Sequence, residues 1–219
     1  MTTPSAREQS RLLNIGDGLT MPLEAVTQTF AIVGKRGRGK TATAKVLAEE
    51  MIGAGQQVVV MDTVGAWWGL HSSLDGNAPG LPVVVFGGIH GDVPLEETAG
   101  AVIARALMSH RVPAVIDLSG FRKAAQRRFA TAFIEELYHS NREPMHVIFD
   151  EADEFAPQSP MQEGRHLLGA MEDFARRGRL RGLTCTLVSQ RPAVIHKDVL
   201  TQGMRGSCAR PSPPRRSCR

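Results

Sequence analysis

Apolar residues along this chain fall into two patterns that alternate from one end towards the other. Short continuous runs of Val, Ile, Leu and Phe predict buried strands, because strands covered on both faces do not alternate apolar and polar positions. These runs are Thr29–Val33, Gln57–Met61, Leu81–Phe86, Ala114–Asp117, His146–Phe149 and Thr184–Val188. Between them, apolar residues recur every three or four positions, which predicts helices with one face on a sheet. This alternation is typical of an α/β fold with a mostly parallel sheet flanked by helices on both faces.

The two ends of the chain depart from this alternation. Two short strand-like pieces flank Gly16-Asp17-Gly18 and predict a hairpin within residues 10–24 that leads into the sheet. The periodicity stops after Leu200, and residues 203–219 are rich in Pro, Ser and Arg, so we expect a disordered basic tail there. The length suits a single domain over residues 1–202.

The formal charge of +4 is concentrated in the predicted tail. That segment holds five of the 26 basic residues and no acid, so 21 basic residues remain against 22 acidic ones. The body is therefore near neutral, which argues against a broad basic surface for nucleic acid. No apolar stretch reaches the length of a membrane span, and the amino-terminal residues lack the apolar core of a secretory signal, so we expect a cytoplasmic protein.

The segment GKRGRGKT, residues 34–41, lies between a predicted strand and a predicted helix. It matches the phosphate-binding loop, in which glycines let backbone N–H groups surround a polyphosphate at the positive end of the following helix. Lys40 would meet the β- and γ-phosphates, and the Thr41 hydroxyl would bind Mg²⁺. A glycine-rich turn with exposed charges is the alternative, which the strand and helix context disfavours. The predicted ATP-binding residues are Gly34, Arg36, Gly37, Arg38, Gly39, Lys40, Thr41 and Ala42.

A buried strand ending in two acids supplies the partner that such a loop needs. Asp150 is placed to hold Mg²⁺, and Glu151 is a general base for the attacking water, although a helix-capping or solvated acid is the alternative for Glu151. Gln190 follows the next predicted strand and would reach the same sheet edge if the two strands are neighbours. There it could sense the γ-phosphate or position water, or simply form the turn before Pro192. We therefore take Glu151, Gln190 and Lys40 as the catalytic candidates, and Thr41 and Asp150 as the metal ligands.

Two further groups of residues are open to more than one interpretation. Four arginines end a predicted helix, where the helix dipole favours them, or where one could reach a neighbouring subunit's nucleotide or DNA phosphates. They are Arg176, Arg177, Arg179 and Arg181. The adjacent Trp67 and Trp68 could contact a base or a subunit, but filling the edge of the core is the favoured role. His90 and His146 have no partners at ligand spacing, so we interpret both as structural.

Four segments occur in the order known from one family: IVGKRGRGKT, MDTVGAWWGL, VIFDEADEFAPQ and VSQRPAVIHKDVLTQ. From about Leu13 to Gln202 the chain resembles the HerA/FtsK superfamily of P-loop ATPases, and specifically the HerA central domain. The resemblance implies a RecA-like fold, a homo-oligomeric ring, usually a hexamer, and ATP-driven movement of double-stranded DNA. It supports the roles given above to Lys40, Thr41, Asp150, Glu151 and Gln190. The letters DEAD also spell an RNA-helicase signature, but the flanking motifs of that group are missing.

The leading functional prediction is a Mg²⁺-dependent ATPase domain of a HerA-like DNA translocase or helicase. The alternative is an ATP-dependent oligomeric switch or interaction module with little turnover, such as a truncated inactive paralogue. The alternative rests on residues 203–219, whose composition departs from the family pattern. A frameshifted terminus would explain that composition. A small-molecule kinase is disfavoured, because the segment Asp75–Gly80 is too short for a lid.

Overall fold

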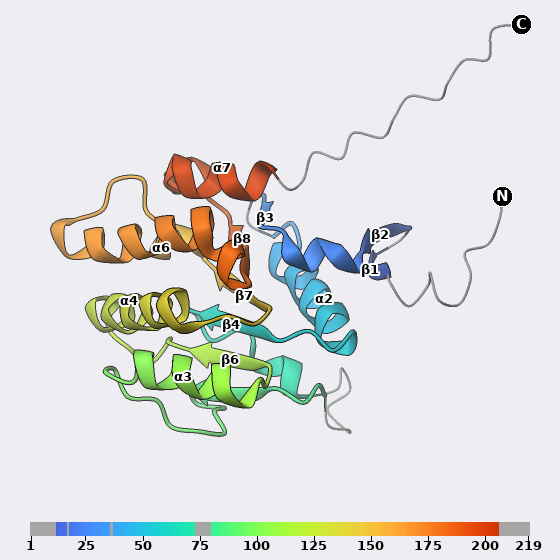
Figure 1. Ribbon diagram of the computed structural model, residues 1–219, viewed down its shortest axis with the longest axis horizontal. Coiled ribbons are helices and arrows are strands. Elements are labelled where there is room, and N and C mark those ends of the chain that lie inside the picture. Colours follow the sequence, from blue (N-terminus) through green and yellow to red (C-terminus); the bar gives the residue numbers. More distant parts are fainter. Residues whose placement is uncertain (1–11, 17, 36, 73–79, 206–219) are drawn as a thin grey trace, which may run out of the picture.

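A computed structural model describes residues 12–16, 18–35, 37–72 and 80–205 and shows a central six-stranded sheet (Figure 1). The strand order is β3-β8-β7-β4-β6-β5, and every neighbouring pair in it is parallel. The strands are β3 (Phe30–Val33), β4 (Val58–Asp62), β5 (Val84–Gly87), β6 (Ala114–Asp117), β7 (Met145–Asp150) and β8 (Leu183–Ser189). All six predicted strands are thus confirmed, and their ends lie within three residues of the predicted ones.

The largest shift is at β5, which begins at Val84 where the apolar run begins at Leu81. Pro82 lies inside the predicted strand and has no backbone N–H to donate to a neighbouring strand. The N–H of Val83 bonds locally to the carbonyl of Leu81 at 2.7 Å, so the chain is still turning there. An apolar run alone therefore overestimated the strand.

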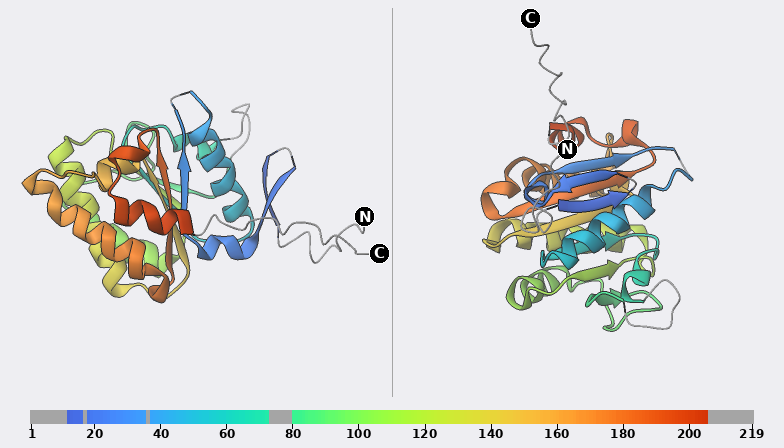
Figure 2. Two further views of the ribbon diagram at one scale, coloured as in Figure 1. Left: turned by 90° about the horizontal axis from the view of Figure 1, so that it is seen from above. Right: turned by 90° about the vertical axis from the view of Figure 1, so that its right-hand side faces the viewer.

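Helices cover the sheet on both faces, as predicted (Figures 1 and 2). On one face lies α2, and on the other lie α3, α4 and α6. Their bounds are α2 (Lys40–Gly53), α3 (Gly100–His110), α4 (Lys123–Ser140) and α6 (Arg165–Arg177). Strand β4 shows why the run is continuously apolar: Val58 and Val60 pack on the α2 side, while Val59 and Met61 pack on the other side.

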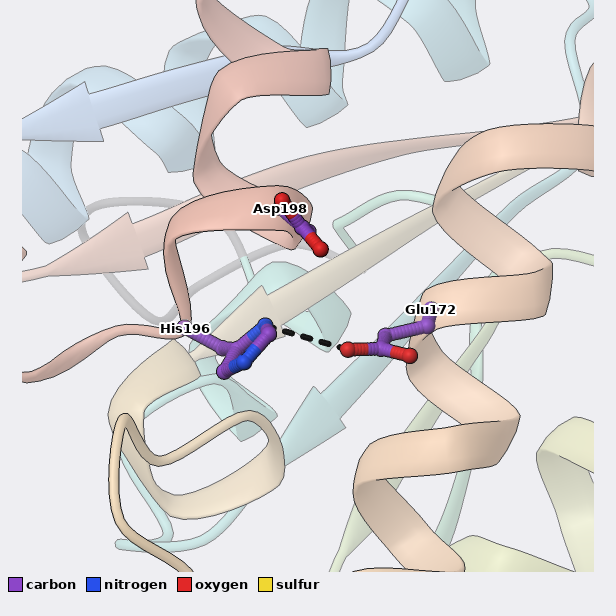
Figure 3. A group of neighbouring side chains, drawn as sticks. All are labelled: Glu172, His196 and Asp198. Carbon is purple, nitrogen blue, oxygen red and sulfur yellow. Dashed lines mark ion pairs between the residues drawn. The ribbon is translucent and has the colours of Figure 1, made fainter.

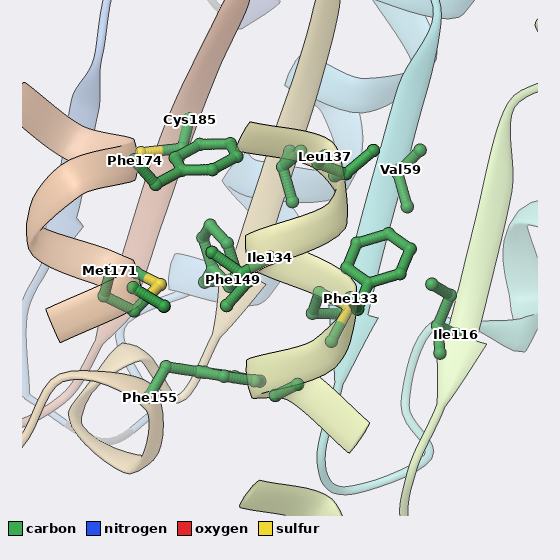
Figure 4. Close-up of a cluster of buried hydrophobic side chains, with 14 of the residues drawn as sticks. Val59, Ile116, Phe133, Ile134, Leu137, Phe149, Phe155, Met171, Phe174 and Cys185 are labelled. Atoms are coloured by element: carbon green, nitrogen blue, oxygen red, sulfur yellow. The ribbon is translucent and has the colours of Figure 1, made fainter. Parts of the chain in front are cut away.

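The larger core lies between the sheet and α3, α4 and α6 (Figure 4). Phe149 of β7 meets Phe174 of α6 edge to face, with ring centroids 5.8 Å apart. Phe133 of α4 is fully buried in the same cluster. Helices α3 and α4 approach closely at Gly100, where an added Cβ would lie 2.4 Å from the carbonyl oxygen of Phe129. This packing fixes the carboxyl ends of the central strands, where the candidate site lies.

The predicted amino-terminal hairpin is present, and the chain leads from it into the sheet. Strands β1 (Leu12–Gly16) and β2 (Leu19–Pro22) pair antiparallel in a separate two-stranded sheet. The short 3₁₀ helix η1 (Leu23–Thr27) then leads to β3. Leu13 is buried against the α2 layer, and the N–H of Asn14 donates to the Glu50 carboxylate at 2.7 Å. The hairpin therefore packs on the helix layer and does not extend the sheet.

The sequence pattern did not predict α7 (Lys197–Arg205), which includes the first three residues of the expected tail. Two contacts to α6 hold this helix. His196 Nδ1 lies 3.1 Å from Glu172 Oε1 (Figure 3), and Arg176 pairs with Asp198 at 2.9 Å. The side chains of Glu172, His196 and Asp198 lie close enough to face one metal ion, but Asp198 already pairs with Arg176. The remaining tail, 206–219, lies outside the described residues.

Among the described helices, none has the length and apolar content that crossing a bilayer requires.

Candidate nucleotide-binding site

The loop between β3 and α2 has the backbone of an anion-binding turn. Gly37 and Gly39 have φ angles of 75° and 78°, the left-handed conformation that glycine adopts without a steric cost. Gly39 is the N-cap of α2 and offers no side-chain acceptor, so the first amide groups of the helix have no side-chain cap. Unpaired amides at a helix start carry partial positive charge and suit a phosphate.

Lys40 and Thr41 begin α2 at this turn and are both partly buried. The Lys40 amine donates to the carbonyl oxygen of Lys35 at 3.2 Å, which holds the amine over its own loop. Arg38 is exposed, and Arg36 lies outside the described residues. The structure therefore supports the predicted loop geometry but does not test Arg36.

A hollow of about 500 Å³ opens beside the loop, at the carboxyl ends of β3, β7 and β8. It brings together most of the predicted site, although Lys40 and Glu151 are far apart in the chain. Its lining residues are Gly37, Gly39, Lys40, Thr41, Ala42, Val64, Asp150, Glu151, Val188, Ser189 and Gln190. Sequence reasoning missed Val64, Val188 and Ser189 as lining residues, whereas Gly34 does not line the hollow.

Asp150 ends β7 and is 3% exposed, while Glu151 follows it in a left-handed backbone conformation with φ 52° and ψ 56°. Glu151 occupies the N-cap position of α5 (Ala152–Phe155), yet its side chain makes no capping hydrogen bond. Its Oε1 instead accepts a hydrogen bond from Gln190 Nε2 at 3.3 Å. The capping alternative for Glu151 is therefore not what the structure shows.

The surroundings of Glu151 raise the pKa of its carboxyl group. Burial is the largest cause, and the negative charges of Asp153 and Asp150 act in the same direction. The Lys40 cation and the hydrogen bond from Gln190 act in the opposite direction and lower the pKa. A carboxyl group with a raised pKa is a stronger base once ionised.

Strand β8 lies between β3 and β7 in the sheet. Its carboxyl end therefore lies between the phosphate-binding loop that follows β3 and the acidic residues at the end of β7. The N–H of Gly34 lies 3.4 Å from the carbonyl oxygen of Ser189, and the Ser189 hydroxyl donates to Asp153 at 2.8 Å. Gln190 follows directly and bonds to Glu151. The expectation that Gln190 and Asp150 share one sheet edge therefore holds.

Trp67 has a contact that the sequence did not reveal. It is fully buried, as the core-edge interpretation predicted, and its indole Nε1–H donates to Asp150 Oδ2 at 2.7 Å. Trp68 is 40% exposed and stacks on His90 with ring centroids 4.1 Å apart. A buried tryptophan N–H needs a hydrogen-bond acceptor. That requirement was the only indication of this contact that the sequence offered.

The arginine cluster does not line the hollow of its own chain. Arg176 pairs with Asp198, Arg177 lies 3.6 Å from Asp173, and Arg181 lies over the ring of Tyr138. Arg179 precedes β8 and lines a separate hollow at the amino ends of the strands. Any role of these arginines at a nucleotide therefore concerns another chain.

The donor set of the hollow fits Mg²⁺. The Thr41 hydroxyl and the Asp150 carboxylate come from different elements and line the same space. Both supply the hard oxygen ligands that Mg²⁺ prefers, and Mg²⁺ usually takes only one or two such protein ligands beside phosphate and water. These two residues are the ones that would hold the ion.

Known proteins similar to this chain share its motifs or its fold. The family model of the helicase HerA central domain matches residues 15–70. The DNA double-strand break repair helicase HerA of Pyrococcus furiosus is 29% identical over 119 residues, which are 50% of this chain and 21% of that protein. This chain therefore spans about a fifth of that relative's length. The matches confirm the resemblance to HerA that the sequence motifs indicated.

One solved structure, a viral NTPase, extends the likeness in fold. The genome packaging NTPase B204 of Sulfolobus turreted icosahedral virus 2, solved with sulfate, has a TM-score of 0.51 and 13% identity over 80% of this chain and 71% of that chain. The pCW3 conjugation coupling protein TcpA, solved with ATPγS, has a TM-score of 0.49 and 15% identity over 89% of this chain and 53% of that chain. At such identities the likeness concerns the fold alone, and the B204 match supports the P-loop NTPase architecture.

Proposed function

We propose that this chain, which is similar to the HerA central domain over residues 15–70, binds ATP with Mg²⁺ and hydrolyses it to move double-stranded DNA. The observation that carries the proposal is the meeting of Lys40, Thr41, Asp150 and Glu151 around one hollow. The similarity to a DNA repair helicase supports the DNA part, since residues 15–70 match that family's central domain.

In this proposal the triphosphate lies on the amide groups that begin α2. Gly37 and Gly39 keep side chains away from that path, and the helix start supplies positive potential. The Lys40 amine then exchanges the neutral carbonyl of Lys35 for phosphate oxygens, because hydrogen bonds between charged partners are shorter and stronger.

The hydrolytic step assigns one proton transfer to Glu151. Its carboxylate accepts the proton of the attacking water, and the raised pKa that burial causes suits this role. Gln190 donates to Glu151 Oε1 and so orients the carboxylate while facing the same hollow. Mg²⁺, when bound by Thr41 and Asp150, neutralises charge on the phosphates.

The proposal includes a homo-oligomeric ring of hexamer type. Among the described residues no arginine lines the hollow, so an arginine that stabilises the transition state would come from a neighbouring subunit. The near-neutral body suits a grip on DNA by a few loops inside a ring better than by one broad basic face. The mass of the assembly with and without ATP tests this part.

The decisive experiment compares the parent chain with Glu151→Gln and Glu154→Gln. We expect Glu151→Gln to lower the hydrolysis rate by about 10²- to 10⁴-fold while ATP still binds. Glu154→Gln is the matched control, because Glu154 pairs with Lys123 at 2.9 Å and does not line the hollow. It should retain the parent rate.

Double-stranded DNA separates the motor from its rival. Faster hydrolysis by the parent in the presence of DNA supports a DNA translocase. If the parent binds ATP but shows no turnover with or without DNA, the motor proposal is wrong and an ATP-dependent oligomeric switch takes its place.

A further inference from the structure

The loop after β4 is folded around one carboxylate. Asp62 Oδ1 accepts the N–H groups of Val64 and Gly65, each at 2.9 Å, and Asp62 Oδ2 accepts the N–H of Trp67 at 2.9 Å. Asp62 is fully buried, so these bonds take the place of water. The loop therefore presents the Trp67 ring in one fixed orientation.

This orientation carries the indole across to the neighbouring strand. Strands β4 and β7 pair in parallel with Met61 opposite Phe149, so their carboxyl ends are adjacent. Trp67 Nε1–H reaches Asp150 Oδ2 at 2.7 Å, and the N–H of Glu151 reaches Asp150 Oδ1 at 3.1 Å. Both carboxylate oxygens of Asp150 thus have a donor, which restrains rotation of the carboxylate.

The same loop is also attached to the helix that follows the phosphate-binding turn. The Lys45 amine of α2 donates to the carbonyl oxygen of Ala66 at 2.6 Å and lies 5.9 Å from the centre of the Trp67 ring. Trp67 consequently lies between the element that carries Thr41 and the strand end that carries Asp150. Among the described side chains, Trp67 is the one that donates a hydrogen bond to Asp150.

We infer that Trp67 is a positioning residue, which holds Asp150 through its indole N–H in the orientation needed to bind Mg²⁺ beside ATP. The inference rests on the proposed function, because it concerns how Asp150 performs the role given to it there. Outer partners of metal ligands commonly set metal affinity, and their loss costs about 10- to 100-fold.

The test uses Trp67→Phe, which keeps an aromatic ring and removes the N–H. Binding of a fluorescent ATP analogue is measured in EDTA and then across a Mg²⁺ titration. We expect Trp67→Phe to raise the Mg²⁺ concentration for half-maximal effect by about tenfold or more, with binding in EDTA unchanged. Trp68→Phe is the matched control, since Trp68 is partly exposed and stacks on His90, and it should behave as the parent.

The outcomes separate the two proposals. A parent that binds no nucleotide overturns the proposed function and this inference with it. A parent that binds, together with a Trp67→Phe variant of unaltered Mg²⁺ requirement, overturns the inference alone, even if the variant melts at a lower temperature.

A second measurement needs no change at Trp67, in case Trp67→Phe fails to fold. This measurement follows the NMR signal of the Trp67 indole N–H. The chain has two tryptophans, so the NMR spectrum of Trp68→Phe identifies which indole signal belongs to Trp67. We expect that resonance to shift when Mg²⁺ is added to the nucleotide-bound protein, and not when nucleotide is added in EDTA. A resonance that ignores Mg²⁺ would contradict the inference.

Discussion

His146 provides a test of how β7 and β8 are held together, independent of the nucleotide site. The ring is 2% exposed, with Nδ1 2.9 Å from Thr184 Oγ1 and Nε2 2.8 Å from Thr186 Oγ1. Nδ1 also lies 3.1 Å from the carbonyl oxygen of Val26. Burial lowers the pKa of His146 from 6.5 to about 4, while the Val26 carbonyl acts in the opposite direction. The test lowers the pH and compares the stability of the parent protein with that of His146→Gln.

The sign follows from where the proton binds. Between pH 6.5 and 4 the unfolded chain binds a proton at His146 and the folded chain does not, so the free energy of unfolding falls as the pH falls. The loss attributable to this one ring is about 2 kcal/mol at pH 5 and roughly 3 kcal/mol at pH 4. Above pH 7 both states hold a neutral ring, and the contribution is constant.

Urea unfolding at pH 7.5, 6.5, 5.5 and 5 measures the effect in the parent, His146→Gln and the control His110→Gln. Acidic side chains also titrate in this range, so the informative quantity is the difference between parent and variant. That difference should change by about 2 kcal/mol between pH 7.5 and 5 for His146→Gln. His110 is exposed at the end of α3 and serves as the surface comparison. Equal pH slopes for all three proteins would refute the burial argument.

Three other predictions follow from packing and from the loop. Gly100→Ala should destabilise the fold by about 1–3 kcal/mol, because the new Cβ meets the Phe129 carbonyl. Gly169 lies on α6 with open space around it, so Gly169→Ala should stabilise the fold by about 0.5–1 kcal/mol. Urea unfolding should therefore give changes of opposite sign for the two variants. Phe174→Ala should cost about 3–5 kcal/mol in the same assay, and a cost below 1 kcal/mol would contradict its packing on Phe149. Lys40→Ala should weaken ATP binding by at least about tenfold in a titration while the unfolding midpoint stays near the parent value, and unchanged binding would remove Lys40 from the site.

The sequence predicted those elements well whose formation depends mainly on their own local composition. Strands covered on both faces need continuous apolar side chains, so β4 and β7 stand out from local composition alone. Helix α7 had no such signal, because its position depends on pairings of Asp198 and His196 with residues of α6 about 20 positions earlier. The placement of the hairpin on α2 likewise depends on distant contacts such as Asn14 with Glu50.

The candidate site divides in the same way. Lys40, Thr41, Asp150 and Glu151 could be predicted, since each ends or begins an element whose type was clear, and parallel strands bring their carboxyl ends to one edge. The bond from Trp67 to Asp150 could not be predicted, because it requires β4 and β7 to be neighbours although two strands separate them along the chain. Local periodicity contains no information on that order.

The backbone at Glu151 bears on how this protein would respond to laboratory selection. A residue with a side chain in the left-handed conformation costs about 1–2 kcal/mol, and glycine or asparagine relieves much of that cost. Screening variants for heat resistance alone should therefore enrich Gly or Asn at position 151. Such variants would gain robustness and lose the carboxylate, so thermal tolerance and turnover favour different residues at the same codon.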